Sequence, residues 1–186
     1  MHTFFRVIRG NTVFLAVLLI GLAGCDRISS ATRTSARTLK STYTITRIAD
    51  GDTVTVSDGT SQKKIRFCGI DAPEKSQPLG AESKATLEKL LKGVDAQNVQ
   101  IDEVERDRYG RSVSEVFIAH ESEADSDKFV NAEMVRAGMA YVYRQYLKSC
   151  PNASALELAE EEAKRSRRGV WSGNYQTPWD YRRSRR

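Results

Sequence analysis

The sequence predicts an α+β domain that is mainly β: a five-stranded barrel with about three helices packed on it. From residue 43 onward, short runs of β-branched and aromatic residues alternate with polar residues, which is the period of a strand that buries one face. Turn-forming pairs such as Asp58-Gly59 separate these runs, and three other stretches carry apolar residues at helical spacing. The chain of 186 residues is long enough for one domain with a sizeable core and for appendages at its ends.

The strand pattern is clearest in five runs, at residues 43–48, 53–56, 64–67, 99–101 and 113–118. Turn signals join the first three runs into a predicted meander, and Asp107-Arg108-Tyr109-Gly110 turns between the last two. Five short strands in this order suit a small closed barrel of the OB type. Helices are expected where apolar residues recur every three or four positions, at 81–91, 129–137 and 154–168.

The N-terminus has the pattern of a targeting segment. A positively charged start precedes an apolar run at residues 13–23, which is too short to span a bilayer comfortably. The run ends in Leu22-Ala23-Gly24-Cys25, which resembles the lipobox of bacterial lipoproteins. We therefore expect a lipoprotein signal peptide at 1–24, lipidation of Cys25 and a flexible polar tether at 25–40. An ordinary secretory signal, in which Cys25 is incidental, is the alternative.

The lipoprotein interpretation predicts an exported protein, held by its lipid on the periplasmic side of a membrane of the bacterial cell envelope. Separately, we expect a monomer. The folded domain is expected at 41–173, followed by a flexible basic tail at 174–186. The formal net charge is +5, which favours contact with nucleic acid or an anionic membrane surface, although many basic proteins bind neither. The tail could add affinity for phosphate or serve solubility alone.

Export also changes the interpretation of Cys68 and Cys150. Disulfides persist outside the reducing cytosol, so these two cysteines could pair and close a long loop. Two buried free thiols are the alternative, because the sequence does not show whether the Cα atoms are close enough to be bridged. A metal site is a poor explanation, since structural zinc takes four ligands and the chain has few histidines.

Three charged motifs together carry the groups that phosphodiester hydrolysis needs. Asp52 and Asp71 lie at the ends of adjacent predicted strands and offer the hard oxygen ligands that calcium and magnesium prefer. Arg66 and Arg111 offer guanidinium groups, which bind phosphate oxygens in pairs and keep their charge. Glu74 follows a rigid proline close to Asp71, where its carboxylate could act on a metal-bound water.

These residues resemble the staphylococcal nuclease family over about 41–173. The segment Asp50-Gly51-Asp52-Thr53-Val54, the segment 71–74 and Tyr109-Gly110-Arg111 stand in the order and at the spacing of the family's motifs. The resemblance implies an OB-fold domain that holds one Ca²⁺ ion through Asp52, Asp71 and the backbone carbonyl of Ala72. It implies catalytic roles for Arg66, Glu74 and Arg111.

The resemblance further implies an endonuclease that hydrolyses DNA and RNA with little sequence specificity and leaves 3′-phosphate ends. Tyr109 and one of Tyr141 or Tyr143 would contact the nucleotide or its phosphate, with packing at the core or rim as the alternative. The chain departs from staphylococcal nuclease itself in four ways. Ala72 replaces a threonine, the loop after Glu74 is shorter, a few residues are missing before Tyr141, and Cys68 and Cys150 have no counterpart there.

Two other functions remain possible at this point. A non-catalytic OB-fold domain of the cell envelope could bind single-stranded nucleic acid without cleaving it, and a plasmid-nicking assay with calcium or chelator separates it from a nuclease. An envelope protein that binds an anionic partner such as a lipid headgroup would also suit the charge. That function gives no reason for Asp52, Asp71, Glu74 and two arginines to occur together.

Overall fold

The computed structural model describes residues 43–95, 98–119 and 126–185, all of which fall within one unit of the chain, residues 37–186. The signal peptide expected at 1–24, the lipidation site Cys25 and the tether expected at 25–40 lie outside the described residues. In the part that is described, no helix is long and apolar enough to cross a membrane.

The main sheet contains the five expected strands. A further short strand, β7 (Lys128–Phe129), pairs with β6 at the side of the sheet path. Its strand order is β1-β2-β3-β6-β5. The first three strands form the predicted antiparallel meander, and β3 runs parallel to β6. The bounds of the five strands are Thr44–Ile48 (β1), Thr53–Ser57 (β2), Gln62–Phe67 (β3), Val99–Arg106 (β5) and Ser112–Ile118 (β6).

The expected α+β, mainly β class with an OB-type arrangement is confirmed, but the expectation of a closed barrel is wrong. Among the strands that the structure describes, the path of the sheet ends at β1 and at β5, and no ladder joins these two edges. The pairing register shifts between Ile45 and Arg47 in β1 and between Glu103 and Glu105 in β5. Such irregularities bend a strand and increase its twist, so the sheet is bent without its edges meeting.

A second, small sheet consists of β4 (Ile70–Asp71) and β8 (Tyr141–Val142). The two strands are antiparallel, and Asp71 is paired with Tyr141. A strand of two residues is too short to carry an alternating pattern, so sequence periodicity could not have predicted it. This pairing fixes the backbone at Ile70 and Asp71.

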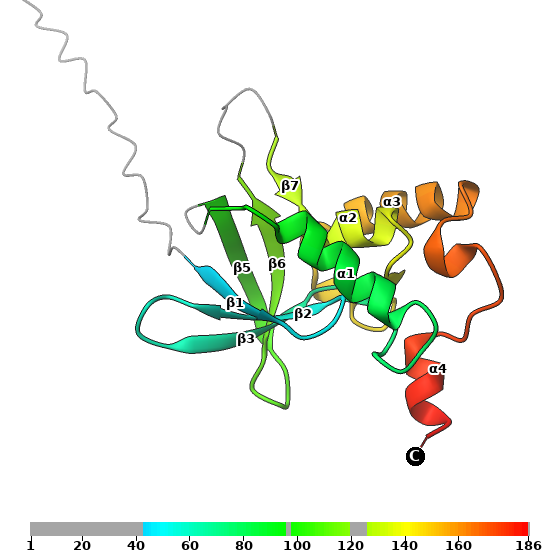
Figure 1. Ribbon diagram of the computed structural model, residues 1–186, viewed down its shortest axis with the longest axis horizontal. Coiled ribbons are helices and arrows are strands. Elements are labelled where there is room, and N and C mark those ends of the chain that lie inside the picture. The colour runs from blue at the N-terminus through cyan, green and yellow to red at the C-terminus, as the bar shows by residue number, and fades with distance from the viewer. Residues whose placement is uncertain (1–42, 96–97, 120–125, 186) are drawn as a thin grey trace, which may run out of the picture. The chain divides into compact units, whose positions relative to one another are not determined.

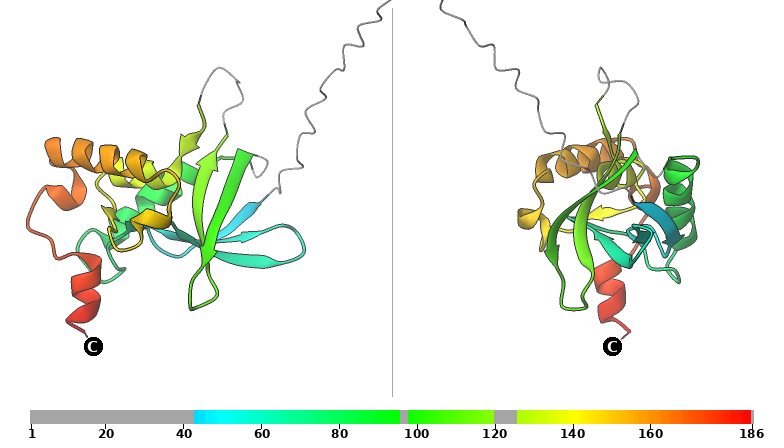
Figure 2. Two further views of the ribbon diagram at one scale, coloured as in Figure 1. Left: turned by 180° about the vertical axis from the view of Figure 1, so that it is seen from behind. Right: turned by 90° about the vertical axis from the view of Figure 1, so that its left-hand side faces the viewer.

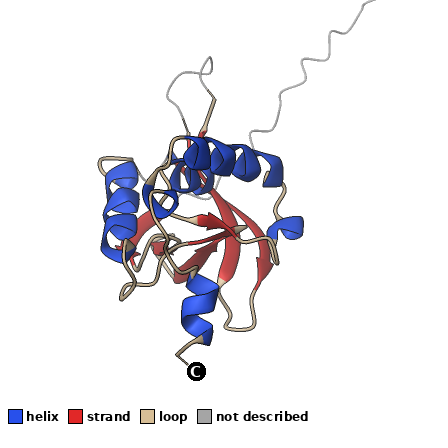
Figure 3. Cartoon of the chain, turned by 90° about the vertical axis from the view of Figure 1, so that its right-hand side faces the viewer, coloured by secondary structure: helices blue, strands red, loops and turns tan. Residues whose placement is uncertain are grey.

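Four α-helices accompany the sheets, at Gly80–Leu91 (α1), Val130–Arg136 (α2), Ala153–Arg165 (α3) and Pro178–Arg183 (α4), with 3₁₀ turns at Leu147–Ser149 and Gly169–Trp171. The first three are the expected helices. Helix α2 packs against both α1 and α3, which lie on opposite sides of the strands (Figure 2). Figure 1 shows α4 close to the C-terminus, separate from the other helices, and Figure 3 shows the same separation from another side.

The expectation of a flexible basic tail at 174–186 is wrong, because residues 178–183 form the helix α4. The local sequence explains this helix. The hydroxyl of Thr177 accepts a hydrogen bond from the backbone N–H of Asp180, and Pro178 occupies the start of the helix, where its missing N–H costs nothing. The arginine-rich composition alone predicts a solvated tail, whereas the signals at Thr177 and Pro178 predict the start of a helix.

The core lies between the main sheet and α1, α2 and α3, and its most buried large side chains include Phe67, Ile65, Leu87 and Met134. At its edge, Cys68 and Cys150 form the disulfide that the sequence allows, with Cα atoms 5.9 Å apart. The residue beside this bridge is Gly69, at φ +71°, where a Cβ atom would come within 2.6 Å of Leu156. Only glycine fits this crowded, left-handed position.

Candidate active site

Asp52 lies in the turn between β1 and β2, with 5% of its surface exposed. Its carboxylate accepts hydrogen bonds from the Thr53 hydroxyl at 2.9 Å and from the Ala72 backbone N–H at 2.6 Å. The turn needs Gly51, because a Cβ atom there would lie 1.8 Å from the hydroxyl oxygen of Ser83 on α1. Burial and then the charge of Asp52 raise the pKa of neighbouring Asp50 to about 6. The turn therefore concentrates negative charge beside the segment that begins at Asp71.

Asp71 is the most deeply buried acid of the site, at 1% exposure. Its backbone is held by the pairing of β4 with β8, opposite Tyr141. Burial raises the pKa of Asp71, although hydrogen bonds from Arg182 and the charge of Arg66 act in the opposite direction. A carboxylate buried to this degree requires cationic partners in order to stay charged.

Arg66, on β3, joins the two aspartates. One terminal nitrogen, Nη1, lies 3.0 Å from Asp52 Oδ2, and the other, Nη2, lies 2.8 Å from Asp71 Oδ1. The side chain of Arg66 is 14% exposed, so these contacts are largely shielded from solvent and from salt. The predicted convergence of Asp52, Asp71 and Arg66 is thus present.

Glu74 stands at the edge of the same cluster. Its backbone N–H donates to the Gln77 side chain at 2.8 Å, and its carbonyl accepts from the Gln77 N–H at 2.8 Å. Gly80 allows this tight loop, because a Cβ atom at that position would lie 2.1 Å from the Glu74 carbonyl oxygen. The Glu74 carboxylate is partly exposed and lies 2.7 Å from Arg182 Nη1.

Arg182, on α4, is the member of the site that sequence analysis missed. Its Nη2 lies 2.7 Å from Asp71 Oδ2, and its Nη1 lies 3.2 Å from Asp71 Oδ1 and 2.7 Å from Glu74 Oε1. Burial lowers the pKa of Arg182, but these hydrogen bonds outweigh burial and raise it overall. The guanidinium therefore remains charged and bridges the two carboxylates.

Arg111 does not join this cluster directly. In the structure its guanidinium is bound by Asp107, with Nε 2.6 Å from Oδ2, and it lies 5.7 Å from the centre of the Tyr109 ring. The backbone of Arg111 is nevertheless close, because the next residue, Ser112, is paired with Ile65 in the parallel β3–β6 ladder. Arg111 thus directly precedes β6, the strand paired with the one that carries Arg66, and its side chain is turned onto its own hairpin.

The three candidate tyrosines lie in different environments. Tyr109 is 68% exposed at the tip of the β5–β6 hairpin, whereas Tyr141 is 4% exposed and makes edge contacts with Trp171 and Trp179. Burial raises the pKa of Tyr141, consistent with a packing position. Tyr143 is partly exposed, and its ring lies parallel to that of Trp179.

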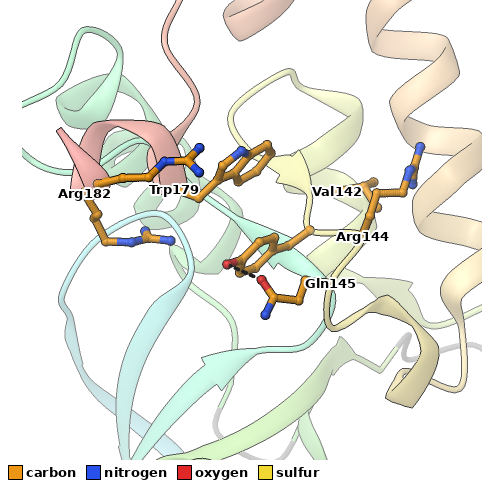
Figure 4. Close-up of a pocket in the computed structure, with 7 residues that line it drawn as sticks. Val142, Arg144, Gln145, Trp179 and Arg182 are labelled. Atoms are coloured by element: carbon orange, nitrogen blue, oxygen red, sulfur yellow. Dashed lines mark hydrogen bonds between the residues drawn. The ribbon is translucent and has the colours of Figure 1, made fainter.

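A groove of about 560 Å³ runs beside Tyr143. One wall is formed by residues 142–145, and the other by Trp179, Arg182 and Arg183 of α4. Figure 4 shows Trp179 and Arg182 across the groove from Val142 and Gln145. The groove thus combines aromatic and cationic groups and ends at the arginine that contacts Asp71 and Glu74.

The buried acids fit a hard divalent cation. Asp52 and Asp71 present carboxylate oxygens within reach of a single guanidinium, and the residue after Asp71, Ala72, contacts the Asp52 carboxylate through its backbone. In the described ranges no three or more acidic, histidine or cysteine side chains form a group that could hold a metal ion by themselves. Calcium accepts such a partial set, because it takes its remaining oxygen ligands from backbone carbonyls, water and substrate phosphate.

Comparison with known proteins shows the family of the chain. A family model described as "Staphylococcal nuclease homologue" matches residues 64–173. The chain is 38% identical over 143 residues to a protein named micrococcal nuclease from Shigella flexneri, covering 75% of this chain and 79% of that protein. It is also 37% identical over 139 residues to a protein named uncharacterized endonuclease from Escherichia coli O157:H7, covering 74% and 82%. With its buried acid pair and bridging arginine, the chain belongs to the family of staphylococcal nuclease homologues.

Proposed function

We propose that this chain, a phosphodiester hydrolase by family, is a calcium-dependent endonuclease that cleaves DNA and RNA with little sequence preference. The single observation that carries the proposal is the convergence of Asp52, Asp71, Arg66 and Glu74 at one place in the fold. A buried acid pair beside a guanidinium and a half-exposed carboxylate is the set of groups that metal-assisted hydrolysis of a phosphate diester requires.

The cation would be held by Asp52, Asp71 and the Ala72 carbonyl, and when bound it supplies positive charge to a phosphate oxygen. Arg66 stabilises the additional charge that develops on the other oxygens. Glu74 accepts a proton from the attacking water, whose oxygen bonds to phosphorus while the bond from phosphorus to the 5′ oxygen breaks. The leaving oxygen takes a proton from solvent, so the products are a 3′-phosphate and a 5′-hydroxyl.

Arg111 is assigned the role of a second phosphate clamp, which requires its side chain to exchange Asp107 for substrate. Both partners of the Arg111–Asp107 pair are partly exposed, and exposed ion pairs are worth little free energy. A phosphate oxygen is a matched bidentate partner for guanidinium. Tyr109 and Tyr143 are the aromatic groups available to bases, because both present ring surface to solvent.

Export and lipid anchoring at Cys25 belong to the same proposal, with the chain acting as a monomer on the periplasmic side of its membrane. Metabolic labelling with a radioactive fatty acid tests the anchor, with Cys25→Ser as the control. Label on the wild-type chain and none on the variant is the expected result. Equal labelling of both would refute lipidation at Cys25.

Nicking of supercoiled plasmid in calcium or in excess chelator tests the activity. We expect cleavage only with calcium, and a loss of at least a hundredfold in Asp71→Asn and Glu74→Gln. Asp102→Asn, which changes an exposed acid on β5, is the matched control and should retain activity. Direct labelling of the products by polynucleotide kinase, without phosphatase treatment, reports the expected 5′-hydroxyl ends. Binding of single strands without cleavage would instead support a non-catalytic binding domain.

A further inference from the structure

Helix α4 is attached to both sides of the active site. On one side the Trp179 ring lies parallel to Tyr143, at 5.2 Å between centroids, and edge-on to Tyr141 at 5.6 Å. On the other side the Tyr181 hydroxyl lies 2.8 Å from the Ser76 hydroxyl and 3.2 Å from the Ser76 carbonyl oxygen. A helix of six residues is marginal on its own, so these contacts determine where it lies.

The position of the helix brings Arg182 to the catalytic acids. Its guanidinium bonds both oxygens of Asp71 and one oxygen of Glu74. Asp71 is 1% exposed at its side chain, whereas Glu74 is 36% exposed. The guanidinium of arginine presents its donors in a rigid planar fork, so it holds two carboxylates in a more fixed arrangement than the rotatable ammonium of lysine does.

The Glu74 carboxylate depends on this contact. Its backbone is fixed by Gln77, and among the described residues the side chain that pairs with the carboxylate itself is Arg182. A partly exposed glutamate otherwise samples several rotamers, and ordering it costs conformational entropy. A general base that is misplaced by about 1 Å can lose about a hundredfold in rate.

We propose that Arg182 is a positioning residue for hydrolysis, which holds the Glu74 carboxylate at a set place relative to Asp71. Nη1 binds the Glu74 carboxylate, whereas Nη2 binds Asp71 Oδ2, which is an oxygen that the cation would also bind. The C-terminal segment is thereby part of the active site. This inference rests on the proposed function, because it assumes that Glu74 acts on the attacking water.

A double-mutant cycle separates positioning from direct contact with the substrate phosphate. If Arg182 acts through Glu74, then Arg182→Ala lowers kcat about 10- to 100-fold in the wild-type background and has little effect in a Glu74→Gln background. KM for DNA should change less than threefold. An equal loss in both backgrounds would overturn the proposal, because it would mean that Arg182 acts independently of Glu74.

Calcium titration of the same variants gives a measurement that does not depend on turnover. Removing Arg182 removes a cation that competes for Asp71, so Arg182→Ala should bind calcium several-fold more tightly while it turns over more slowly. A residue needed only for folding would weaken both properties. Weaker calcium binding in Arg182→Ala would therefore contradict the proposal.

Two further variants complete the experiment, which uses the full chain. Arg185→Ala removes an arginine just beyond the same helix, where its guanidinium lies over the Tyr181 ring, and it should keep wild-type kcat. Arg182→Lys keeps the charge without the fork and should stay well below wild-type turnover, so full activity in this variant would also overturn the inference. If wild-type protein cleaves no nucleic acid, the proposed function fails and the inference fails with it. If the wild-type protein cleaves nucleic acid but the effects of the Arg182 and Glu74 mutations simply add, the inference fails and the proposed function stands.

Discussion

The parallel rings of Tyr143 and Trp179, with centroids 5.2 Å apart, join the segment after β8 to the C-terminal helix. Tyr143 follows the strand that is paired with β4, the strand that carries Asp71. Trp179 belongs to the helix that carries Arg182. One aromatic contact therefore links the position of the buried acid to that of the arginine that binds it.

Removing the Trp179 ring should lower turnover strongly and the free energy of unfolding only slightly. Trp179→Ala removes the anchor of α4, so we expect a tenfold or larger fall in kcat because Arg182 is no longer held beside Glu74. The helix lies at the edge of the fold, and we expect the free energy of unfolding to fall by only about 1 to 2 kcal/mol. Steady-state kinetics and urea unfolding of the same preparation measure the two effects. Wild-type turnover in Trp179→Ala would show that α4 does not need this anchor.

Reducing the disulfide should destabilise the protein without altering its active site. Cys68 and Cys150 are separated by 82 residues, and closing a loop of that length is worth on the order of 4 kcal/mol in the chain-entropy model. Guanidinium unfolding with and without reductant measures the change. The double variant Cys68→Ala/Cys150→Ala is the control and should not respond to reductant. If reductant leaves the wild-type midpoint unchanged, the bond contributes nothing to stability.

Glu115 should be essential for stability, although it is charged and buried. Its side chain on β6 is 2% exposed and accepts hydrogen bonds from the backbone N–H and side-chain amide of Asn152, at 2.8 and 2.6 Å. Asn152 precedes α3, so the carboxylate binds unpaired donors at a helix start. We expect Glu115→Ala to cost roughly 3 kcal/mol in urea unfolding. The exposed Glu105 on β5 provides the control, and an equal effect of Glu105→Ala would count against this role.

Asp58 should contribute stability that depends on pH. Its carboxylate accepts hydrogen bonds from the backbone N–H groups and hydroxyls of Ser61 and Thr60, at 2.8 to 3.0 Å. These bonds, led by the Ser61 N–H, hold the pKa of Asp58 well below its usual range. A lowered pKa in the folded state stabilises the fold above the unfolded value, near 4, and this contribution disappears as the pH falls further.

Thermal unfolding of wild type and Asp58→Ala across pH measures that contribution. The wild-type Tm should exceed that of the variant by a constant amount between about pH 5 and 7, and the difference should shrink below about pH 4. A Tm difference between wild type and Asp58→Ala that grows as the pH falls would contradict a lowered pKa of Asp58 in the folded state.

Much of the fold was predictable from local sequence, because Thr53–Ser57, Gln62–Phe67 and Ser112–Ile118 carry the alternation of half-buried strands. The strands β4 and β8 have two residues each, which is too few to show a period. Closure of the sheet was predicted wrongly, since pairing between its two edge strands is a property of the whole sheet and not of any segment.

The active site likewise contains residues that the sequence could predict and one that it could not. Asp52, Asp71 and Glu74 stand in motifs that are local in sequence, so their grouping could be predicted. Arg182 lies 111 residues after Asp71, and no local pattern records a contact over that distance. The capping signals at Thr177 and Pro178 could have revealed the helix but not its partners.

The central claim is that Asp52 and Asp71 form one calcium site. Calorimetric titration of calcium into the full chain tests it most directly, with Asp71→Asn alongside and Asp102→Asn as the control. We expect one ion per wild-type chain, an affinity at least tenfold weaker in Asp71→Asn, and no change in the control. Equal binding by wild type and Asp71→Asn, or no binding by wild type, would contradict the claim.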